Sequence, residues 1–312
     1  MASFILSTAM LLAVGAAASV PKIDGFTLTW SDDFSGPAKS LPDPKNWILD
    51  IGKSYPGGAQ NWGTGETQTY TDSPDNIALS GDGKLIITPL RHGTGNTTKW
   101  TSARIETQRK DFEPAPGGKL RIQGRIQMPD VSGEEAAGYW PAFWTLGGRF
   151  RGNFTNWPVV GEIDILENVN GIDKVWSTLH CDVAPGGKCN ESSGLGKTSP
   201  CGLGKPCQGY FHTYAVEIDR STKPEQMTWE VDGTVYHTLN ETALGEAVWL
   251  ETVADGGHML LLNVAMGGGF PDAFYKNSTV YTPIPETRPG VPMIVDYVAV
   301  YNSIDSSYWH GK

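Results

Sequence analysis

Short segments rich in β-branched and aromatic residues recur along the chain, separated by Gly, Pro, Asp and Asn, and helical periodicity is scarce. Residues 119–123 and 228–232 alternate polar with apolar side chains, as half-buried strands do. Asp232-Gly233 follows Val231 as a hairpin-turn signal. No linker or internal repeat divides the chain, so the pattern predicts one all-β sandwich domain. Strands are predicted at residues 26–30, 84–89, 119–127, 214–218, 227–231, 259–264 and 294–301.

The composition excludes two broad classes of protein. The chain has 312 residues, 39% of them hydrophobic, with 11 Trp and 11 Tyr. It is therefore too apolar for a disordered protein and long enough to bury a sizeable core. Its formal net charge is −10, and no cluster of Lys and Arg supplies the basic surface of a nucleic-acid binder. We expect no nucleic-acid partner.

The first 19 residues carry no charged side chain, and residues 4–18 are almost wholly apolar. Small residues, Ala16-Ala17-Ala18, precede Ser19, which predicts a secretory signal peptide over residues 1–19. The alternative is a membrane anchor, but the apolar run is short for a span and nothing similar follows it. We therefore expect a secreted, extracellular domain over residues 20–312 that is not attached to a membrane.

Two further features agree with secretion, namely five glycosylation sequons and four clustered cysteines. An even number of cysteines in an oxidising compartment predicts two disulfides, although three pairings are possible and the sequence does not choose among them. With His180 alongside, a metal site is the alternative, but the spacings match no zinc pattern. The sequons are at Asn96, Asn153, Asn190, Asn240 and Asn277, and the cysteines are Cys181, Cys189, Cys201 and Cys207.

Residues 184–209 interrupt the rhythm of strands. This Cys-rich stretch contains seven glycines and three of the four cysteines, with almost no apolar periodicity. A loop of this length inside a compact domain is usually functional or stapled, which we expect here. The alternative is a surface insertion that the fold merely tolerates.

Three carboxylates alternate with large apolar residues at residues 161–167, Gly-Glu-Ile-Asp-Ile-Leu-Glu. Strand alternation places Glu162 and Asp164 on one face. Glu167 would turn to the other face unless a β-bulge near Ile165-Leu166 absorbs one residue. Four strand steps of about 3.3 Å separate the outer Cα atoms by roughly 13 Å, so two Glu side chains leaning together bring their carboxyls to about 5–5.5 Å.

That separation is typical of a retaining glycosidase, in which one carboxylate is the nucleophile and the other the acid/base. Crowded acids also raise at least one pKa, as a general acid requires. Trp140, Trp144 and Trp157 lie nearby in the sequence and offer the flat apolar surfaces of a sugar-binding cleft. The alternatives are a solvated acidic face and a calcium site.

The sequence resembles glycoside hydrolase family 16 over nearly all of the chain after residue 19. This family includes laminarinases, lichenases and β-galactan hydrolases, and the resemblance implies a concanavalin-like β-jelly-roll sandwich of two antiparallel sheets. GEIDILE at 161–167 is the most specific motif, in the bulged form typical of the laminarinase-like branch. The other motifs are WSDDF (30–34), GETQTYTDSPDNI (65–77), GKLIITP (83–89), TSARIETQ (101–108), WPAFWTLG (140–147), LLLNVAMGG (260–268) and VDYVAVY (295–301).

The resemblance implies that Glu162 is the nucleophile, Glu167 the acid/base, and Asp164 the residue that hydrogen-bonds and tunes the nucleophile. The residues alone do not decide which Glu does which. The resemblance also implies sugar-binding roles for six further residues, and it places His180 beside the acid/base. The alternative for His180 is a histidine that is merely packed, and the alternative for Trp144 is a residue of the core. These candidates are Trp140, Trp144, Arg104, Glu66, His180 and Asn263.

The substrate is expected to be a polysaccharide with β-1,3 linkages. Ile218 stands where many β-glucanases carry Trp, and the Asn168–Gly171 segment and the Cys-rich stretch also depart from the common laminarinase form. Together these departures resemble the fungal endo-β-1,3-galactanase branch, so galactan, the main chain of arabinogalactan proteins, is the first expectation and β-1,3-glucan the alternative. Galactose and glucose differ in one hydroxyl, which only a placed hydrogen bond or a clash discriminates.

Two other functions remain open on the same fold, a lectin-like binding protein and a transglycosylase. The first has no use for Glu162 and Glu167 together, and the second differs in whether sugar or water accepts the intermediate. No cofactor is required, because two carboxylates suffice, and no catalytic metal is expected. The resemblance permits a structural calcium involving Asp296. We expect the protein to be a monomer.

Overall fold

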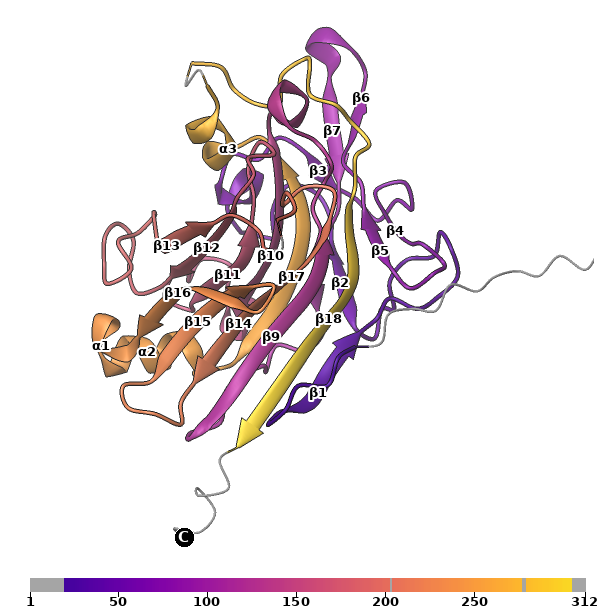
Figure 1. Cartoon of the computed structure of the whole chain (residues 1–312). Helices are drawn as coiled ribbons and strands as arrows, with labels where there is room; N and C mark the ends of the chain where they lie inside the picture. The colour runs from indigo at the N-terminus through magenta and orange to yellow at the C-terminus, as the bar shows by residue number, and fades with distance from the viewer. Residues whose placement is uncertain (1–19, 203, 277–278, 305–312) are drawn as a thin grey trace, which may run out of the picture.

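The computed structural model describes residues 20–202, 204–276 and 279–304, which form a β-sandwich (Figure 1). Sheet A has eight strands in the order β16-β15-β14-β9-β18-β5-β4, with β1 paired to β18. Sheet B has seven in the order β13-β12-β11-β10-β17-β8-β2. Every pair within these two sheets is antiparallel, which confirms the predicted all-β, two-sheet, single-domain fold.

The strands have the following bounds. Sheet A consists of β1 (Thr27–Asp32), β4 (Ile77–Leu79), β5 (Leu85–Ile87), β9 (Gly118–Gln127), β14 (Phe211–Asp219), β15 (Gln226–Val231), β16 (Thr234–Asn240) and β18 (Met293–Ile304). Sheet B consists of β2 (Trp47–Asp50), β8 (Arg104–Thr107), β10 (Tyr139–Gly147), β11 (Glu162–Glu167), β12 (Val175–His180), β13 (Leu195–Ser199) and β17 (His258–Met266). A small third sheet joins β3 (Thr69–Tyr70), β7 (Lys99–Ser102) and β6 (Leu90–His92).

Helices are few and short, as the pattern indicates. The α-helices are α1 (Glu241–Leu244), α2 (Glu246–Val253) and α3 (Gly269–Phe274), and the 3-10 turns are Gln60–Gly63, Gly95–Thr97, Gly133–Ala136 and Gly148–Phe150. The sequence did not predict α2, because eight residues give little periodicity. Its Trp249 is buried, and the indole N–H donates to Glu225 Oε2 at 2.9 Å, so tertiary packing stabilises this short helix.

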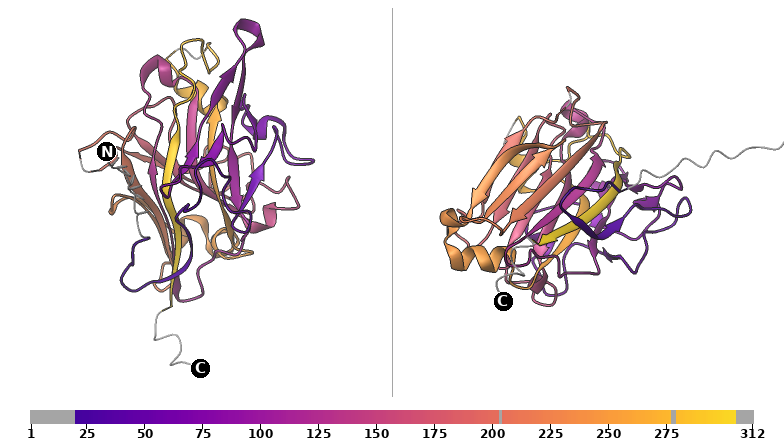
Figure 2. Two further views of the ribbon diagram at one scale, coloured as in Figure 1. Left: turned by 90° about the vertical axis from the view of Figure 1, so that its right-hand side faces the viewer. Right: turned by 60° about the horizontal axis from the view of Figure 1, so that its bottom comes forward.

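The core lies between the two sheets, where alternate residues of each strand meet. Ile122 and Val298 of sheet A and Phe143, Ile163 and Leu262 of sheet B belong to one buried cluster. The other face of sheet B carries the polar residues described below. Figure 2 shows the two layers from two further directions. Burial of one face of each strand fixes its register, because a slip of one residue would turn the apolar set outward.

All seven predicted strand segments are confirmed, with shifts of a few residues at their ends. The predicted hairpin turn is also confirmed, because Asp232 and Gly233 connect β15 to β16. Both residues have positive φ, 50° and 76°, as the tight hairpin turn of this type requires.

The Cys-rich stretch is stapled, as predicted. Cys181 is bonded to Cys189, and Cys201 to Cys207, so each disulfide closes a short loop. The stretch also holds a strand that the sequence did not predict, β13, which pairs with β12 at the edge of sheet B. Its three central residues, Gly196, Lys197 and Thr198, are all exposed, so the strand has no hydrophobic alternation to reveal it.

Several predictions about the chain's surroundings stay predictions. The expected signal peptide lies outside the described residues, as does the sequon at Asn277, and the Asn96 side chain is not among the described ones. Asn153 and Asn190 are exposed and Asn240 is half-buried. In the described part of the chain, no helix has the length and apolar character needed to cross a membrane.

Candidate active site

A β-bulge in β11 brings the three acids to one face, as predicted. Ala142 of β10 pairs with Glu167 and Trp144 pairs with Asp164, so β11 has one residue more than its partner between these pairs. The register with β12 shifts at the same place. Ile163, Ile165 and Leu166 are all in the core, which leaves Glu162, Asp164 and Glu167 on the opposite face.

The bulge is tied to the other sheet through the core. At the bulge the Asp164 carbonyl accepts a hydrogen bond of 2.9 Å from the indole N–H of Trp229, a fully buried residue of β15. A buried carbonyl without such a donor would destabilise the strand, so Trp229 stabilises the irregular geometry that the site needs. Sequence reasoning missed this residue because its partner lies 65 positions away.

Two indoles contact the outer acids. Trp157 Nε1 donates to Glu162 Oε2 at 3.1 Å, and Trp140 Nε1 donates to Glu167 Oε1 at 2.9 Å. Glu162 is half-buried, whereas Glu167 is 9% exposed and Asp164 is 4% exposed. The predicted Trp140 thus lies against a catalytic candidate, and Trp157 joins the site at its other end.

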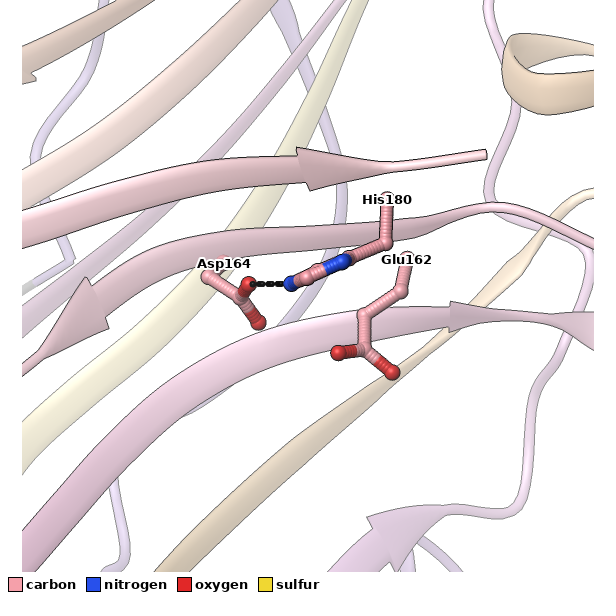
Figure 3. A group of neighbouring side chains, drawn as sticks. All are labelled: Glu162, Asp164 and His180. Carbon is pink, nitrogen blue, oxygen red and sulfur yellow. Dashed lines mark ion pairs between the residues drawn. The ribbon is translucent and has the colours of Figure 1, made fainter. Parts of the chain in front are cut away.

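His180, at the end of β12, faces Glu162 and Asp164 (Figure 3). It pairs in register with Glu162, and its Nε2 lies 3.5 Å from Asp164 Oδ2. One polar atom of each of Glu162, Asp164 and His180 lies within 4.8 Å of the others. The closest acidic partner of His180 on β11 is Asp164, and the His180 charge also acts on Glu167, so the expected place of His180 beside the acid/base stays a prediction.

Burial raises the pKa values of all three acids, and repulsion within the group adds to the shifts of Asp164 and Glu167. Burial raises the pKa of Glu167 to about 7, although the Trp140 hydrogen bond opposes the shift. Burial also raises the pKa of Glu162, while the His180 charge lowers it. The pKa of Asp164 lies well above its usual range because of burial and of the negative charges of Glu167 and Glu162. A pKa of about 7 suits Glu167 as a proton donor near neutral pH.

The pKa of His180 is raised, although burial alone would lower it, because Glu191 accepts a hydrogen bond from its ring and the nearby acids favour the cation. Both ring nitrogens of an imidazolium carry protons and have no lone pair for a metal. Glu162, Asp164 and His180 have the donor atoms of a cation site, but a charged His180 favours hydrogen bonding to the acids.

Arg104 forms the centre of an aromatic group next to β10. Its guanidinium carbon lies 4.5 Å from the ring centroid of Trp62, 4.9 Å from that of Trp144 and 5.2 Å from that of Tyr55. Its Nε forms an ion pair of 3.0 Å with Asp50. Trp144 is half-buried, stacks on this cation and packs against a small buried cluster that includes Leu261, so it lies outside the main core between the sheets.

A chain of hydrogen bonds connects Glu66 to Trp144. Tyr70 donates to Glu66 Oε2 at 2.9 Å, Asn263 Nδ2 donates to the Tyr70 hydroxyl at 3.1 Å, and Trp144 Nε1 donates to Asn263 Oδ1 at 2.8 Å. Glu66 and Asn263 are both buried. Asn263 thus holds the Trp144 N–H directly and Glu66 acts on it through Tyr70, and the sugar-binding roles of Glu66 and Asn263 stay predictions.

A cluster of aromatic rings near Glu167 was not predicted. Trp176 of β12 is the register partner of Glu167, and its ring contacts those of Phe270 and Phe274 of α3. Phe270 also contacts Trp140. Phe274 is 48% exposed, and the other three rings are half-buried. Short segments that are far apart in the sequence supply these rings, so no local sequence pattern predicts the cluster.

Two positions named from the sequence lie elsewhere. Ile218 is fully buried between the sheets and pairs with Met227 and Leu120, so it cannot contact a substrate or determine specificity. The Asp296 Oδ2 atom forms an ion pair of 2.6 Å with Arg125. A calcium ion at Asp296 stays a prediction.

Comparisons with known proteins agree with this geometry. A family model described as "XgeA-like, catalytic GH16 domain" matches residues 78–227. The crystal structure of an endo-1,3-beta-glucanase from Streptomyces sioyaensis is 49% identical, has a TM-score of 0.87, and covers 92% of this chain and all of its own. A beta-glucanase of Rhodothermus marinus is 31% identical over 91% of this chain and 88% of its own. A glucan endo-1,3-beta-glucosidase of Cryptopygus antarcticus is 29% identical over 78% and 82%.

Proposed function

The chain belongs to glycoside hydrolase family 16, and from this premise we propose that it is a secreted, retaining endo-β-1,3-glucanase. The observation that carries the proposal is the pair of Glu162 and Glu167 on one face of the bulged strand, each with an indole N–H as partner. The raised pKa of Glu167, about 7, suits a general acid, because the carboxyl still holds its proton near neutral pH.

Glu162 attacks the anomeric carbon of the sugar, and the glycosidic bond breaks as Glu167 gives its proton to the leaving oxygen. A covalent glycosyl ester on Glu162 results. Glu167, now a carboxylate, takes a proton from water, whose oxygen attacks the same carbon and releases Glu162. Asp164, whose pKa lies well above its usual range, lies between the two acids on the same face, so a proton on it would keep a third negative charge out of the site. Two inversions at one carbon retain its configuration.

Glucan is a better supported substrate than galactan. The relatives reported above are named as glucanases, and the chain covers most of their length. The position of Ile218 in the core also removes one of the reasons for expecting galactan. The Arg104 group and the aromatic cluster at Trp176 supply flat rings for several sugar units of a chain. These rings favour a polysaccharide substrate cleaved at internal bonds.

Extracellular action is part of the proposal, because both disulfides persist in an oxidising compartment. Transfer to a second sugar in place of water uses the same glycosyl ester, and the ratio of the two outcomes depends on which acceptor reaches it. Products longer than the substrate would reveal such transfer.

The test is to incubate the protein separately with laminarin and with debranched β-1,3-galactan, and to measure new reducing ends. We expect cleavage of laminarin, with chain length falling before monosaccharide accumulates. Glu162→Gln should bind laminarin without cleaving it, whereas Glu134→Gln, a change at an exposed carboxylate, should leave turnover intact. Cleavage of galactan alone would overturn the substrate, and binding without cleavage by the unmodified protein would favour the lectin-like alternative.

A further inference from the structure

We propose that Glu191, in the Cys-rich stretch, is a positioning residue that holds His180 as an imidazolium aimed at Asp164 and Glu162. This role rests on the proposed glycosidase function, in which Glu162 must be a carboxylate. Glu191 does not touch the reacting atoms and acts only through His180. The Cys-rich stretch is then part of the catalytic apparatus rather than a tolerated insertion.

Both carboxylate oxygens of Glu191 are directed at this one position of the chain. Oε2 lies 2.8 Å from His180 Nδ1, and Oε1 accepts a hydrogen bond of 2.8 Å from the backbone N–H of Cys181, the next residue. The side chain has no exposed surface. A buried carboxylate with these two partners fixes the proton on Nδ1 and the orientation of the ring, as carboxylates do for histidines in other sites.

The same segment also approaches the ring through its backbone at Gly194. A Cβ atom placed on Gly194 would lie 2.8 Å from His180 Cε1 and 3.0 Å from Nδ1, too close for a side chain. Gly194 also has a φ of +71°, which favours glycine. The backbone at Gly194 thus confines the imidazole, leaving Nε2 to face Asp164 at 3.5 Å.

The backbone of Glu191 is hydrogen-bonded to the loop that the Cys181–Cys189 disulfide closes. Gly186 N–H donates to the Glu191 carbonyl at 2.7 Å, and Glu191 N–H donates to the Gly186 carbonyl at 2.5 Å. Gly186 lies inside the loop that the Cys181–Cys189 bond closes. The disulfide loop therefore holds the backbone of Glu191 in place, so that less backbone entropy opposes the contact with His180.

The charges that face His180 determine the consequence. Glu162, Asp164 and Glu167 face it from β11 and Glu191 from the loop, while Arg104 acts on Glu162 from β8. The His180 cation lowers the pKa of Glu162 and also that of Glu167. Glu191 itself raises the pKa of Glu162, but this direct effect is smaller than that of His180. Without Glu191, the pKa of His180 falls and the nucleophile becomes harder to ionise.

The expected result for Glu191→Gln is an acid limb of the kcat/KM profile on laminarin that moves upward by about one pH unit. The basic limb moves in the same direction, because Glu167 also loses a cationic neighbour. In a His180→Asn background, the same substitution should no longer move the acid limb upward, since the cation is already gone. An unchanged profile in folded Glu191→Gln, or an equal upward shift in the His180→Asn background, would overturn the proposal.

Asp182→Asn is the matched control for loosening of the loop. Asp182 Oδ2 accepts a hydrogen bond of 2.8 Å from Lys188 N–H within the same disulfide loop. This substitution weakens the loop and leaves the Glu191–His180 contact in place, so we expect an unchanged pH profile. A shift equal to that of Glu191→Gln would assign the effect to loop rigidity and contradict the proposal.

A measurement on the unmodified protein keeps the proposal testable if Glu191→Gln fails to fold. The NMR titration of the His180 ring should give a pKa above the ordinary histidine value of about 6.5, with the Nδ1 proton protected from exchange. A value at or below 6.5 would overturn the role of Glu191. This titration does not depend on activity, so a protein inactive on laminarin would refute the proposed function while the Glu191–His180 result stood separately.

Discussion

The hydrogen bond from Trp140 to Glu167 offers a quantitative test of the acid/base assignment. Burial raises the pKa of Glu167 to about 7, and the indole N–H, 2.9 Å from Oε1, opposes that shift by stabilising the carboxylate. Trp140→Phe removes the N–H and retains a ring in its place. The protonated acid should then persist to higher pH, and the basic limb of the kcat/KM profile should move upward.

The size of the shift follows from the environment of the bond. A hydrogen bond to a charged group contributes about 1.5–3 kcal/mol, and one pKa unit corresponds to about 1.4 kcal/mol. Glu167 is 9% exposed, so water replaces the lost donor only in part. We therefore expect the limb to move from about 7 to about 8 or slightly higher, since the lower end of this range alone gives about one unit.

The assay is the pH dependence of kcat/KM on laminarin for the unmodified protein and two variants. Trp144→Phe is the matched control, because the Trp144 N–H donates to Asn263 and not to an acid of β11. Its basic limb should stay in place even if its KM rises. A downward or absent shift in Trp140→Phe, or an equal shift in Trp144→Phe, would refute Glu167 as the group behind that limb.

Three further predictions concern stability and substrate length. The folded pKa of Glu167, about 7, exceeds the ordinary 4.5, so the stability that this carboxyl contributes is lost as pH rises from 4.5 to 7. In denaturant titrations at pH 4 and pH 8, the free energy of unfolding of Glu167→Gln should therefore rise by about 1–3 kcal/mol relative to that of the unmodified protein on going to pH 8. Replacing both Cys201 and Cys207 by Ser should lower the free energy of unfolding by about 2 kcal/mol, measured the same way, and failure to do so would contradict the paired cysteines. Phe274→Ala should reduce kcat/KM on laminarin more than on a trisaccharide, whereas Tyr281→Ala, at another exposed ring, should reduce neither; equal losses on both substrates would exclude Phe274 from a distant subsite.

The sequence predicts those parts of the fold that depend on local alternation. The strands and the hairpin at Asp232-Gly233 follow from period two and from turn chemistry. Period two alone turns Glu167 away from Glu162, and the family motif indicated the bulge that returns it. The catalytic candidates could be found from the sequence because one strand carries all three acids.

The remainder depends on contacts between distant segments. The Trp229 indole reaches the bulge from the opposite sheet, and Phe274 comes from a six-residue helix. Glu191 lies in a glycine-rich stretch without periodicity, where only the folded loop shows which group it faces. Ile218 illustrates the converse error, since a departure from a family pattern indicated specificity while the residue itself lies in the core.

Proton NMR of laminarin during cleavage tests the central claim most directly. Double displacement through Glu162 and Glu167 predicts that new reducing ends appear first as the β-anomer and reach the equilibrium mixture only by later mutarotation. This single time course reports the substrate, the cleavage and the stereochemistry together. First appearance of the α-anomer, or laminarin that stays intact, would contradict the account.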